Sequence, residues 1–285
     1  MARRLLSCET GSFNKIGGNF EIIKLLYQAG FQAYDFSMFE GHVNRLIDAD
    51  NYQQKAQELR QYADGLGIVC NQAHAPFPTI KENDDNYNNY IFQKITKAIE
   101  VAYILGARTI IVHPCNNYTA EQNADMYQRF LPYLKDFGMK IALENMWNRK
   151  KGAKYVNKAA CSHHKDFLKH LSLLDERYFT ACLDIGHAEM KGLKTSAVKI
   201  INTLADRLTN LHIHDNDLCG DLHQLPFTGK INFEEILDAL KQNNYQGDIT
   251  FEANNYIKPF PLDLYPKAGR LLAEIGNYFK DRLEN

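Results

Sequence analysis

Short apolar runs alternate with amphipathic stretches along the whole chain. Eight runs rich in Val, Ile, Leu and Phe have the length of buried strands: residues 4–9, 31–37, 68–76, 109–115, 140–146, 179–187, 208–215 and 248–253. The stretches between and after them repeat apolar residues at helical spacing: residues 20–28, 52–63, 87–105, 121–137, 165–173, 196–204, 233–242 and 262–279. The pattern therefore predicts a strand followed by a helix eight times.

Eight such units without an interrupting linker favour a closed parallel α/β barrel, the (β/α)8 or TIM barrel, formed as a single domain by residues 1–285. An open doubly wound sheet is the alternative, but no GxGxxG motif follows the first predicted strand. The longest irregular stretches, residues 147–162 and 216–231, both follow strands. In a barrel this position puts them on the catalytic rim.

Charged and imidazole side chains close, or directly follow, most of the apolar runs. Buried strands rarely contain such residues unless the side chain is paired or binds a metal. A TIM barrel brings the carboxyl ends of all eight strands to one mouth. We therefore predict one metal-centred active site from nine residues: His74, His113, Glu144, Asp184, His187, His212, Asp221, His223 and Glu252.

The residue types in this set indicate the metal and leave two chemistries open. Mixed His and carboxylate ligands suit zinc, manganese, iron or cobalt, and five histidines favour a transition metal such as Zn²⁺ or Mn²⁺, with one to three ions. Glu144 and Glu252 could also transfer protons at a carbon beside a metal-polarised carbonyl. Alternatively, two or three ions could bind a phosphodiester and activate water. Both chemistries use the same types of ligand.

Three further residues are candidates for contact with the substrate. Trp147, the only tryptophan, lies at the predicted rim and could stack on a sugar ring or pack against the following loop. Lys230 could meet an oxyanion or simply face solvent. His214 shares a strand face with His212 by alternation, and could support the ligands or belong to the core.

The charge and the cysteine content of the chain limit the classes of binding partner and the cellular compartment that are expected. The net charge of −1 and sequence pI of about 6.8 give no overall basic field of the kind that attracts nucleic acid or anionic membranes. A small-molecule substrate is expected, with no membrane partner and with a homo-oligomer as an open possibility. The six cysteines show no CxxC spacing, and four of them lie within predicted core strands. They resemble the small buried residues of a protein from a reducing compartment, so a cytoplasmic location is expected.

The order of several short motifs resembles the xylose isomerase-like TIM-barrel superfamily, also called AP endonuclease family 2, over nearly the whole chain. The motifs are ALEN at 142–145, LDIGH at 183–187, LHIHD at 211–215, DLH at 221–223, TGKIN at 228–232 and FEAN at 251–254. The superfamily includes sugar epimerases and isomerases as well as endonuclease IV, which acts on abasic DNA. The resemblance thus implies one of two activities.

The two branches of the superfamily imply different metal sites. In the ketose 3-epimerase branch one ion is bound at the positions of Glu144, Asp184, His212 and Glu252, with the two glutamates transferring protons and His187 contacting the substrate. In the endonuclease IV branch three zinc ions use those positions together with His74, His113, His187, Asp221 and His223. This chain contains all nine residues.

Three positions depart from the patterns of these branches. Leu218 stands where characterised epimerases have a substrate-binding arginine, Lys150 stands where they have a further glutamate, and Ile185-Gly186 interrupts the endonuclease IV form of the sixth-strand motif. We therefore expect a metal-dependent isomerase or epimerase of a sugar or polyol that differs from a plain ketohexose. The alternative is a trinuclear zinc phosphodiesterase, and the third interpretation is a sensor that only binds sugar or metal.

Overall fold

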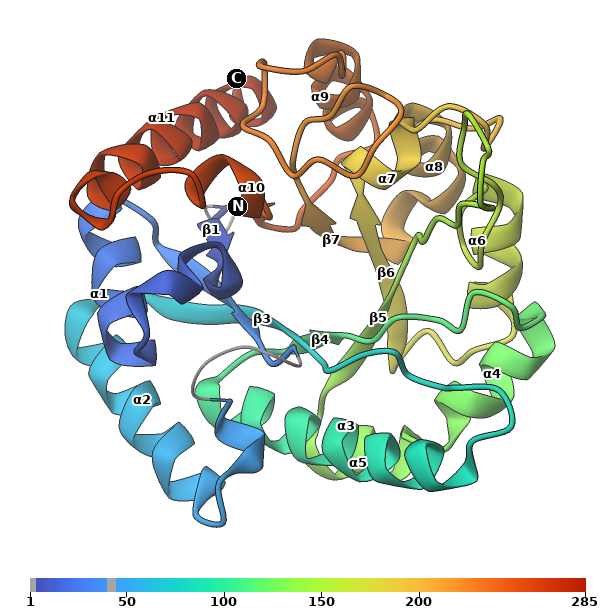
Figure 1. The fold of residues 1–285 in the computed structure, drawn as a ribbon, viewed down its shortest axis with the longest axis horizontal. Helices are drawn as coiled ribbons and strands as arrows, with labels where there is room; N and C mark the ends of the chain where they lie inside the picture. The colour runs from blue at the N-terminus through green and yellow to red at the C-terminus, as the bar shows by residue number, and fades with distance from the viewer. Residues whose placement is uncertain (1–3, 40–44) are drawn as a thin grey trace.

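Parallel strands form a ring at the centre of the computed structural model, and helices surround it (Figure 1). The structure describes residues 4–39 and 45–285. The strands are β1 Leu6–Glu9, β2 Ala33–Ser37, β3 Val69–His74, β4 Thr109–Ile111, β5 Lys140–Glu144, β6 Phe179–Asp184, β7 Leu208–His212 and β8 Ile249–Phe251. Each strand pairs in parallel with its neighbour in the order β7-β6-β5-β4-β3-β2-β1-β8.

The ring closes just beyond the end of β7. Ile213 forms an isolated parallel bridge with Phe251. The Ile213 N–H donates to the Thr250 carbonyl at 3.0 Å, and the Glu252 N–H donates to the Ile213 carbonyl at 3.0 Å. The predicted TIM barrel is confirmed, and its closing bridge lies directly beside two of the predicted metal ligands, His212 and Glu252.

The long helices lie outside the ring, in the order expected for repeated strand–helix units (Figure 1). They are α1 Asn19–Ala29, α2 Tyr52–Leu66, α3 Asp85–Leu105, α4 Ala120–Gln128, α5 Leu131–Phe137, α6 His164–Ser172, α8 Ala197–Leu204, α9 Phe233–Gln242 and α11 Tyr265–Glu284. Short helices α7 Ile185–Glu189 and α10 Asn254–Ile257 follow β6 and β8, and 3₁₀ turns occupy η1 Thr10–Ile16, η2 Leu46–Asp48, η3 Ala205–Arg207 and η4 Leu262–Leu264. In the described part of the chain, none of these helices combines the length and the apolar character needed to span a membrane.

Several expected strands are longer than the observed ones, and two expected elements differ because of local turn chemistry. The helix expected over 121–137 is divided into α4 and α5, and Pro132, which has no N–H to donate, lies in the first turn of α5. The strand expected over 179–187 ends at Asp184, whose carboxylate accepts from the His187 N–H at 2.7 Å and caps the start of α7. This cap places His187 one helical turn beyond Asp184, on the same rim.

Candidate metal centre

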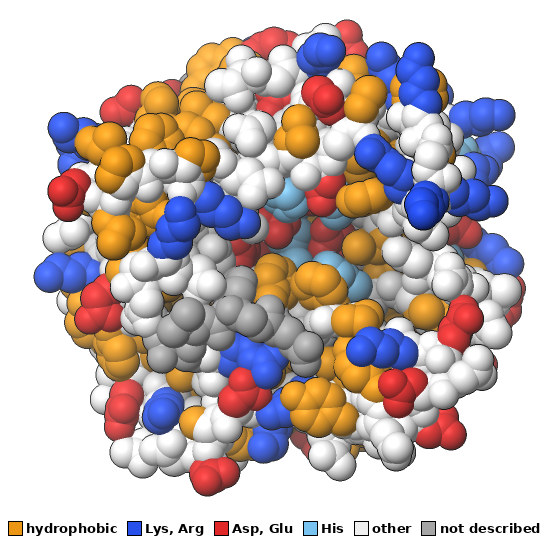
Figure 2. Space-filling view, in the orientation of Figure 1, with side chains coloured by type: hydrophobic (Ala, Val, Ile, Leu, Met, Phe, Trp, Pro, Cys, Tyr) orange, Lys and Arg blue, Asp and Glu red, His pale blue; other side chains and the backbone are white. Residues whose placement is uncertain are grey.

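The predicted ligands gather in a hollow at the centre of the barrel mouth, where Figure 2 shows His, Asp and Glu side chains together. Four groups of such side chains occur in the described chain, and in each group one ligand atom of every residue lies within 4.8 Å of the others; one of them joins His74 and His212 to Asp35, and the other three contain only residues singled out from the sequence. The central group is Glu144, Asp184, His212 and Glu252; the β3–β4 group is His74, His113 and Glu144; the loop group is His187, His214, Asp221 and His223. All nine residues singled out from the sequence belong to these groups.

The central group is enclosed at the ends of β5, β6, β7 and β8. Asp184 and His212 are fully buried, Glu144 is 1 % exposed and Glu252 is 6 % exposed. His212 Nδ1 lies 3.4 Å from a carboxylate oxygen of each glutamate but makes no hydrogen bond. Three buried carboxylates around one imidazole are costly without a compensating cation. The donor set therefore fits a divalent transition metal bound by these four residues.

Glu144 faces two groups at once. Its Oε1 lies toward His212 of the central group, while its Oε2 lies 3.1 Å from His113 Nε2 and 3.7 Å from His74 Nε2. The two histidine Nε2 atoms are themselves only 2.7 Å apart. Convergence of two imidazole nitrogens and a carboxylate oxygen at one point is typical of a metal site. A carboxylate shared in this way could bridge two ions.

The loop group lies beside the central group and is more exposed. Asp221 places one oxygen 3.3 Å from His187 Nε2 and the other 3.1 Å from His223 Nε2. The opposite ring nitrogens are occupied, because His187 Nδ1 donates to the Asn145 carbonyl at 3.0 Å and His223 Nδ1 donates to the Glu252 carbonyl at 2.7 Å. Such bonds fix the tautomer and direct the other nitrogen toward a ligand.

Burial and the neighbouring charges shift the pKa values of the two glutamates in opposite directions. Burial raises the pKa of Glu144, but the charges of His212 and His113 outweigh burial and hold that pKa well below its usual value. Burial raises the pKa of Glu252, and the charges of His212 and His223 offset it only in part. Two carboxyl groups with pKa values pushed apart suit a base and an acid in the same site.

A cavity of about 280 Å³ opens onto these groups. Its lining includes ligands of all three groups and the apolar side chains Phe39, Phe77, Met146 and Trp147. The volume lies near the lower end of the ~300–1,000 Å³ usual for small-molecule sites.

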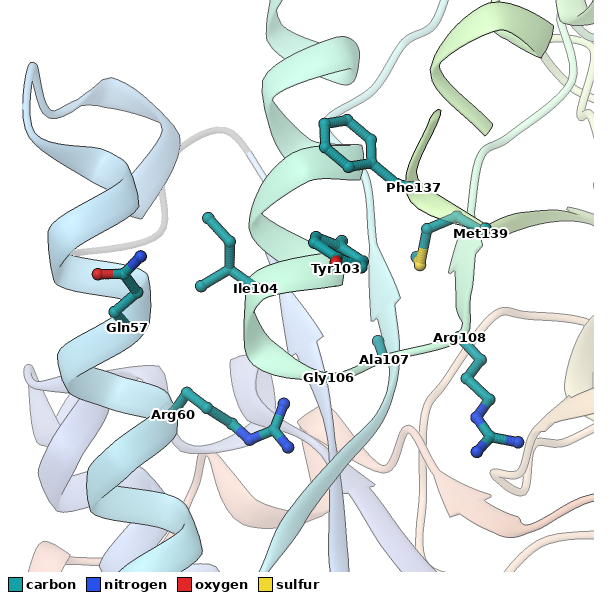
Figure 3. A pocket seen from close by; sticks show the side chains of 10 residues that line it. Gln57, Arg60, Tyr103, Ile104, Gly106, Ala107, Arg108, Phe137 and Met139 are labelled. Carbon is teal, nitrogen blue, oxygen red and sulfur yellow. The ribbon is translucent and has the colours of Figure 1, made fainter. Parts of the chain in front are cut away.

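A second hollow, of about 800 Å³, lies away from the site, between α2 and the ends of α3 and α5 (Figure 3). Arg60, Tyr103, Arg108 and Phe137 are among its lining residues, and none of the described lining residues is a carboxylate or a histidine. It offers no ligands for a metal.

The three predicted substrate contacts take different positions. Trp147 lines the cavity, with its ring 6.4 Å from that of His187. His214 is fully buried, and its Nε2 lies 3.1 Å from Asp184 Oδ1, a contact that fits the supporting role that the sequence left open. Lys230 is exposed and is not among the residues that line the cavity. A substrate contact by Lys230 stays a prediction.

Several residues of the site were not found from the sequence. Asp35, in the middle of β2, is fully buried and lies 3.0 Å from His212 Nε2. The sequence contained the signal, a charged residue within an apolar strand, but Asp35 does not close its strand as the other acids do. Phe39, Phe77 and Met146 line the cavity, and apolar residues of this kind cannot be distinguished from core residues by sequence pattern.

Comparison with known proteins assigns the family. A family model described as the xylose isomerase-like TIM barrel matches residues 23–275. The chain belongs to this family. This xylose isomerase-like barrel is 28 % identical over 193 residues to the uncharacterized protein MJ1311 of Methanocaldococcus jannaschii, a match that covers 64 % of each chain. The chain therefore spans somewhat less than two thirds of that relative's length.

Two further similarities concern sugar epimerases. The xylose isomerase-like chain is 25 % identical over 129 residues to fructoselysine 3-epimerase of Escherichia coli O157:H7, covering 45 % of this chain and 44 % of the epimerase. It superposes on the crystal structure of a D-tagatose 3-epimerase-like protein with a TM-score of 0.75 and 22 % identity, over 98 % of both chains. At that identity the superposition shows a shared fold.

Proposed function

We propose that this chain is a metal-dependent isomerase or epimerase of a sugar or sugar-like polyol. The observation that supports this best is the placement of two glutamates, Glu144 and Glu252, in one buried group of metal ligands at the base of a cavity. Similarity to a curated fructoselysine 3-epimerase and to a tagatose 3-epimerase-like fold supports the substrate class.

The two glutamates occupy different sides of the mouth, at the ends of β5 and β8, which are three strands apart around the ring. One carboxylate would remove a proton from the carbon next to a carbonyl, and the other carboxyl would return a proton to the same or an adjacent carbon. A divalent ion held by Glu144, Asp184, His212 and Glu252 would supply positive charge beside the carbonyl oxygen. His187 and Trp147 would contact the substrate.

The lining of the cavity favours a small uncharged substrate. Among the described residues that line it there is no Lys or Arg, the groups that usually bind a phosphate. The apolar surface of Phe39, Phe77, Met146 and Trp147 suits the carbon face of a polyol. We therefore expect a neutral ketose or ketose derivative rather than a sugar phosphate.

Hydrogen exchange at carbon tests the proposal even when the product has not been identified. The metal-loaded protein is incubated with a panel of ketoses and fructosamines in D2O, and the substrate C–H signals are followed by proton NMR. Loss of the signal next to the carbonyl is expected for at least one substrate. Glu252→Gln should slow the appearance of product signals by about 10²–10⁴-fold with the fold intact, because net conversion needs both proton-transfer groups. Product formation at the normal rate in this variant would exclude Glu252 from proton transfer.

Hydrolysis of a phosphoester is the second candidate, and one observation favours it. Glu144 presents one oxygen to the central group and the other to the β3–β4 group, with the loop group adjacent, so three ions could lie side by side. Metal analysis of the purified protein separates the candidates. One tightly bound ion supports the isomerase, whereas three zinc ions together with cleavage of a duplex that contains an abasic site would support the phosphodiesterase.

A further inference from the structure

We propose that Asp35 is a positioning residue that fixes the tautomer of His212 and so directs Nδ1 of that histidine to the metal of the central group. The inference rests on the proposed function in one respect, since it requires that the central group binds a metal. The proposal assigns a role to the Asp35 carboxylate of β2, which lies on the side of His212 away from the cavity.

The contact between the two side chains is short and completely enclosed. Asp35 Oδ2 lies 3.0 Å from His212 Nε2, and both side chains are fully buried. An ionised carboxylate only accepts hydrogen bonds, so the proton of a neutral imidazole is held on Nε2. Nδ1 then presents its lone pair, and this is the nitrogen that lies between Glu144 and Glu252 without a hydrogen bond of its own.

A chain of amide groups holds Asp35 in this role. The Asn210 amide donates to Gln72 Oε1 at 2.7 Å, which turns the Gln72 amide nitrogen toward Asp35 Oδ2 at 2.8 Å. Gln72 Nε2 also lies 3.2 Å from His212 Nε2, and because both nitrogens are donors, the Asp35 oxygen between them is their common acceptor. Residues from β2, β3 and β7 thus fix one orientation of the imidazole.

The same principle orients two other ligand histidines, but with different acceptors. His187 and His223 are held by backbone carbonyls of Asn145 and Glu252. His212 is held by a side chain, so its orientation can be changed by substitution. A carboxylate acceptor also makes the imidazole a stronger ligand than a carbonyl does, and loss of such a partner typically weakens metal binding by about 10–100-fold.

The test compares two buried carboxylates of the barrel. Asp35→Asn keeps the shape of the side chain but places an amide against His212, and an amide group donating to Nε2 would move the proton to Nδ1. Glu9→Gln is the matched control: Glu9 is fully buried on the adjacent strand β1, yet its oxygens accept from the Gly11 and Ser12 N–H groups and from the Ser37 hydroxyl rather than from His212. Zinc affinity is measured for each metal-free protein by competition with a chromophoric chelator.

We expect Asp35→Asn to bind zinc about 10–100-fold more weakly than the unaltered protein, and Glu9→Gln to bind it nearly as tightly. The Co²⁺-loaded Asp35→Asn protein should also show altered visible absorption bands, which a purely structural role would leave in place. Equal weakening by both substitutions would overturn the proposal, because it would show only the effect of charge within the barrel. So would unchanged affinity in Asp35→Asn.

Two further measurements separate the remaining outcomes. Asp35, His74 and His212 also lie within 4.8 Å of one another, so Asp35 could itself be a ligand; one ion fewer in Asp35→Asn at saturating zinc would overturn the positioning role. If the variant does not fold, ¹⁵N NMR of histidine in the unaltered protein should show His212 protonated at Nε2, and protonation at Nδ1 would refute the proposal. Absence of zinc binding by the unaltered protein would refute the proposed function instead.

Discussion

The central group and the loop group are built from similar ligands in different ways. Every side chain of the central group stands at or next to the end of a barrel strand and is almost completely buried. In the loop group, Asp221 and His223 come from the long segment between β7 and α9, and their side chains are 21 % and 16 % exposed. One group is therefore positioned by the sheet, and the other by a loop.

Both candidate reactions, isomerisation and phosphoester hydrolysis, would need an ion in the central group. Only phosphoester hydrolysis would also need ions in the β3–β4 and loop groups. Strand ends in a barrel hold side chains in fixed relation because their backbone bonds are fully paired. A loop can change without loss of the barrel, and functional variation within a fold is concentrated there. We infer that the central group determines whether the protein is a metalloenzyme, and that the loop group determines how many ions take part.

The largest effect is expected from Glu144→Gln. This substitution removes the carboxylate shared by the central and β3–β4 groups, so we expect the central group to lose metal, together with any ion of the β3–β4 group, and carbon–hydrogen exchange to slow by more than about 10²-fold. Metal analysis and the NMR exchange assay provide the measurements. Glu189→Gln is the control, because Glu189 accepts from the Ala197 N–H at 2.6 Å outside all the groups. Normal exchange in Glu144→Gln would contradict the proposed role of the central group.

A smaller effect is expected from Asp221→Asn. Asp221 bridges His187 and His223, so its loss should abolish any metal binding by the loop group and leave the central group loaded. If the protein is an isomerase that uses one ion, exchange should slow by less than about tenfold, equivalent to about 1.4 kcal/mol in the barrier. A loss as large as that in Glu144→Gln would remove the distinction between the groups and favour the multinuclear phosphodiesterase.

The ligands positioned by the strands were also the ones that the sequence predicted most directly. Glu144, Asp184, His212 and Glu252 could be predicted because a charged residue at the end of an apolar run has few structural explanations. The barrel could be predicted because its strand and helix periods alternate eight times. His187 was found although its strand was predicted too long, since the Asp184 cap that starts α7 keeps it on the rim.

The residues and contacts that the sequence did not predict depend on pairings across the barrel, which no local pattern contains. Asp35 resembles an ordinary strand residue until β7 brings His212 to within 3.0 Å of it. For His214 the sequence left a substrate contact, a supporting role and a core position open, and its contact with Asp184 at 3.1 Å depends on β6 and β7 lying side by side. Phe39 and Phe77, which line the cavity, were not predicted because apolar residues of this type also form the core.

The smallest effect is expected at the apolar wall of the cavity. Trp147 lines the cavity, and its ring lies 6.4 Å from that of His187, so Trp147→Ala should raise KM several-fold through lost contact area while kcat changes little. Lys230→Ala is the matched control, because Lys230 is exposed and outside the lining. Steady-state kinetics on the substrate found by NMR exchange measures both. A rise in KM with Lys230→Ala alone would contradict this prediction. It would place the substrate over the loop after β7 and indicate an anionic group on the substrate, whereas the described lining of the cavity contains no Lys or Arg to bind such a group.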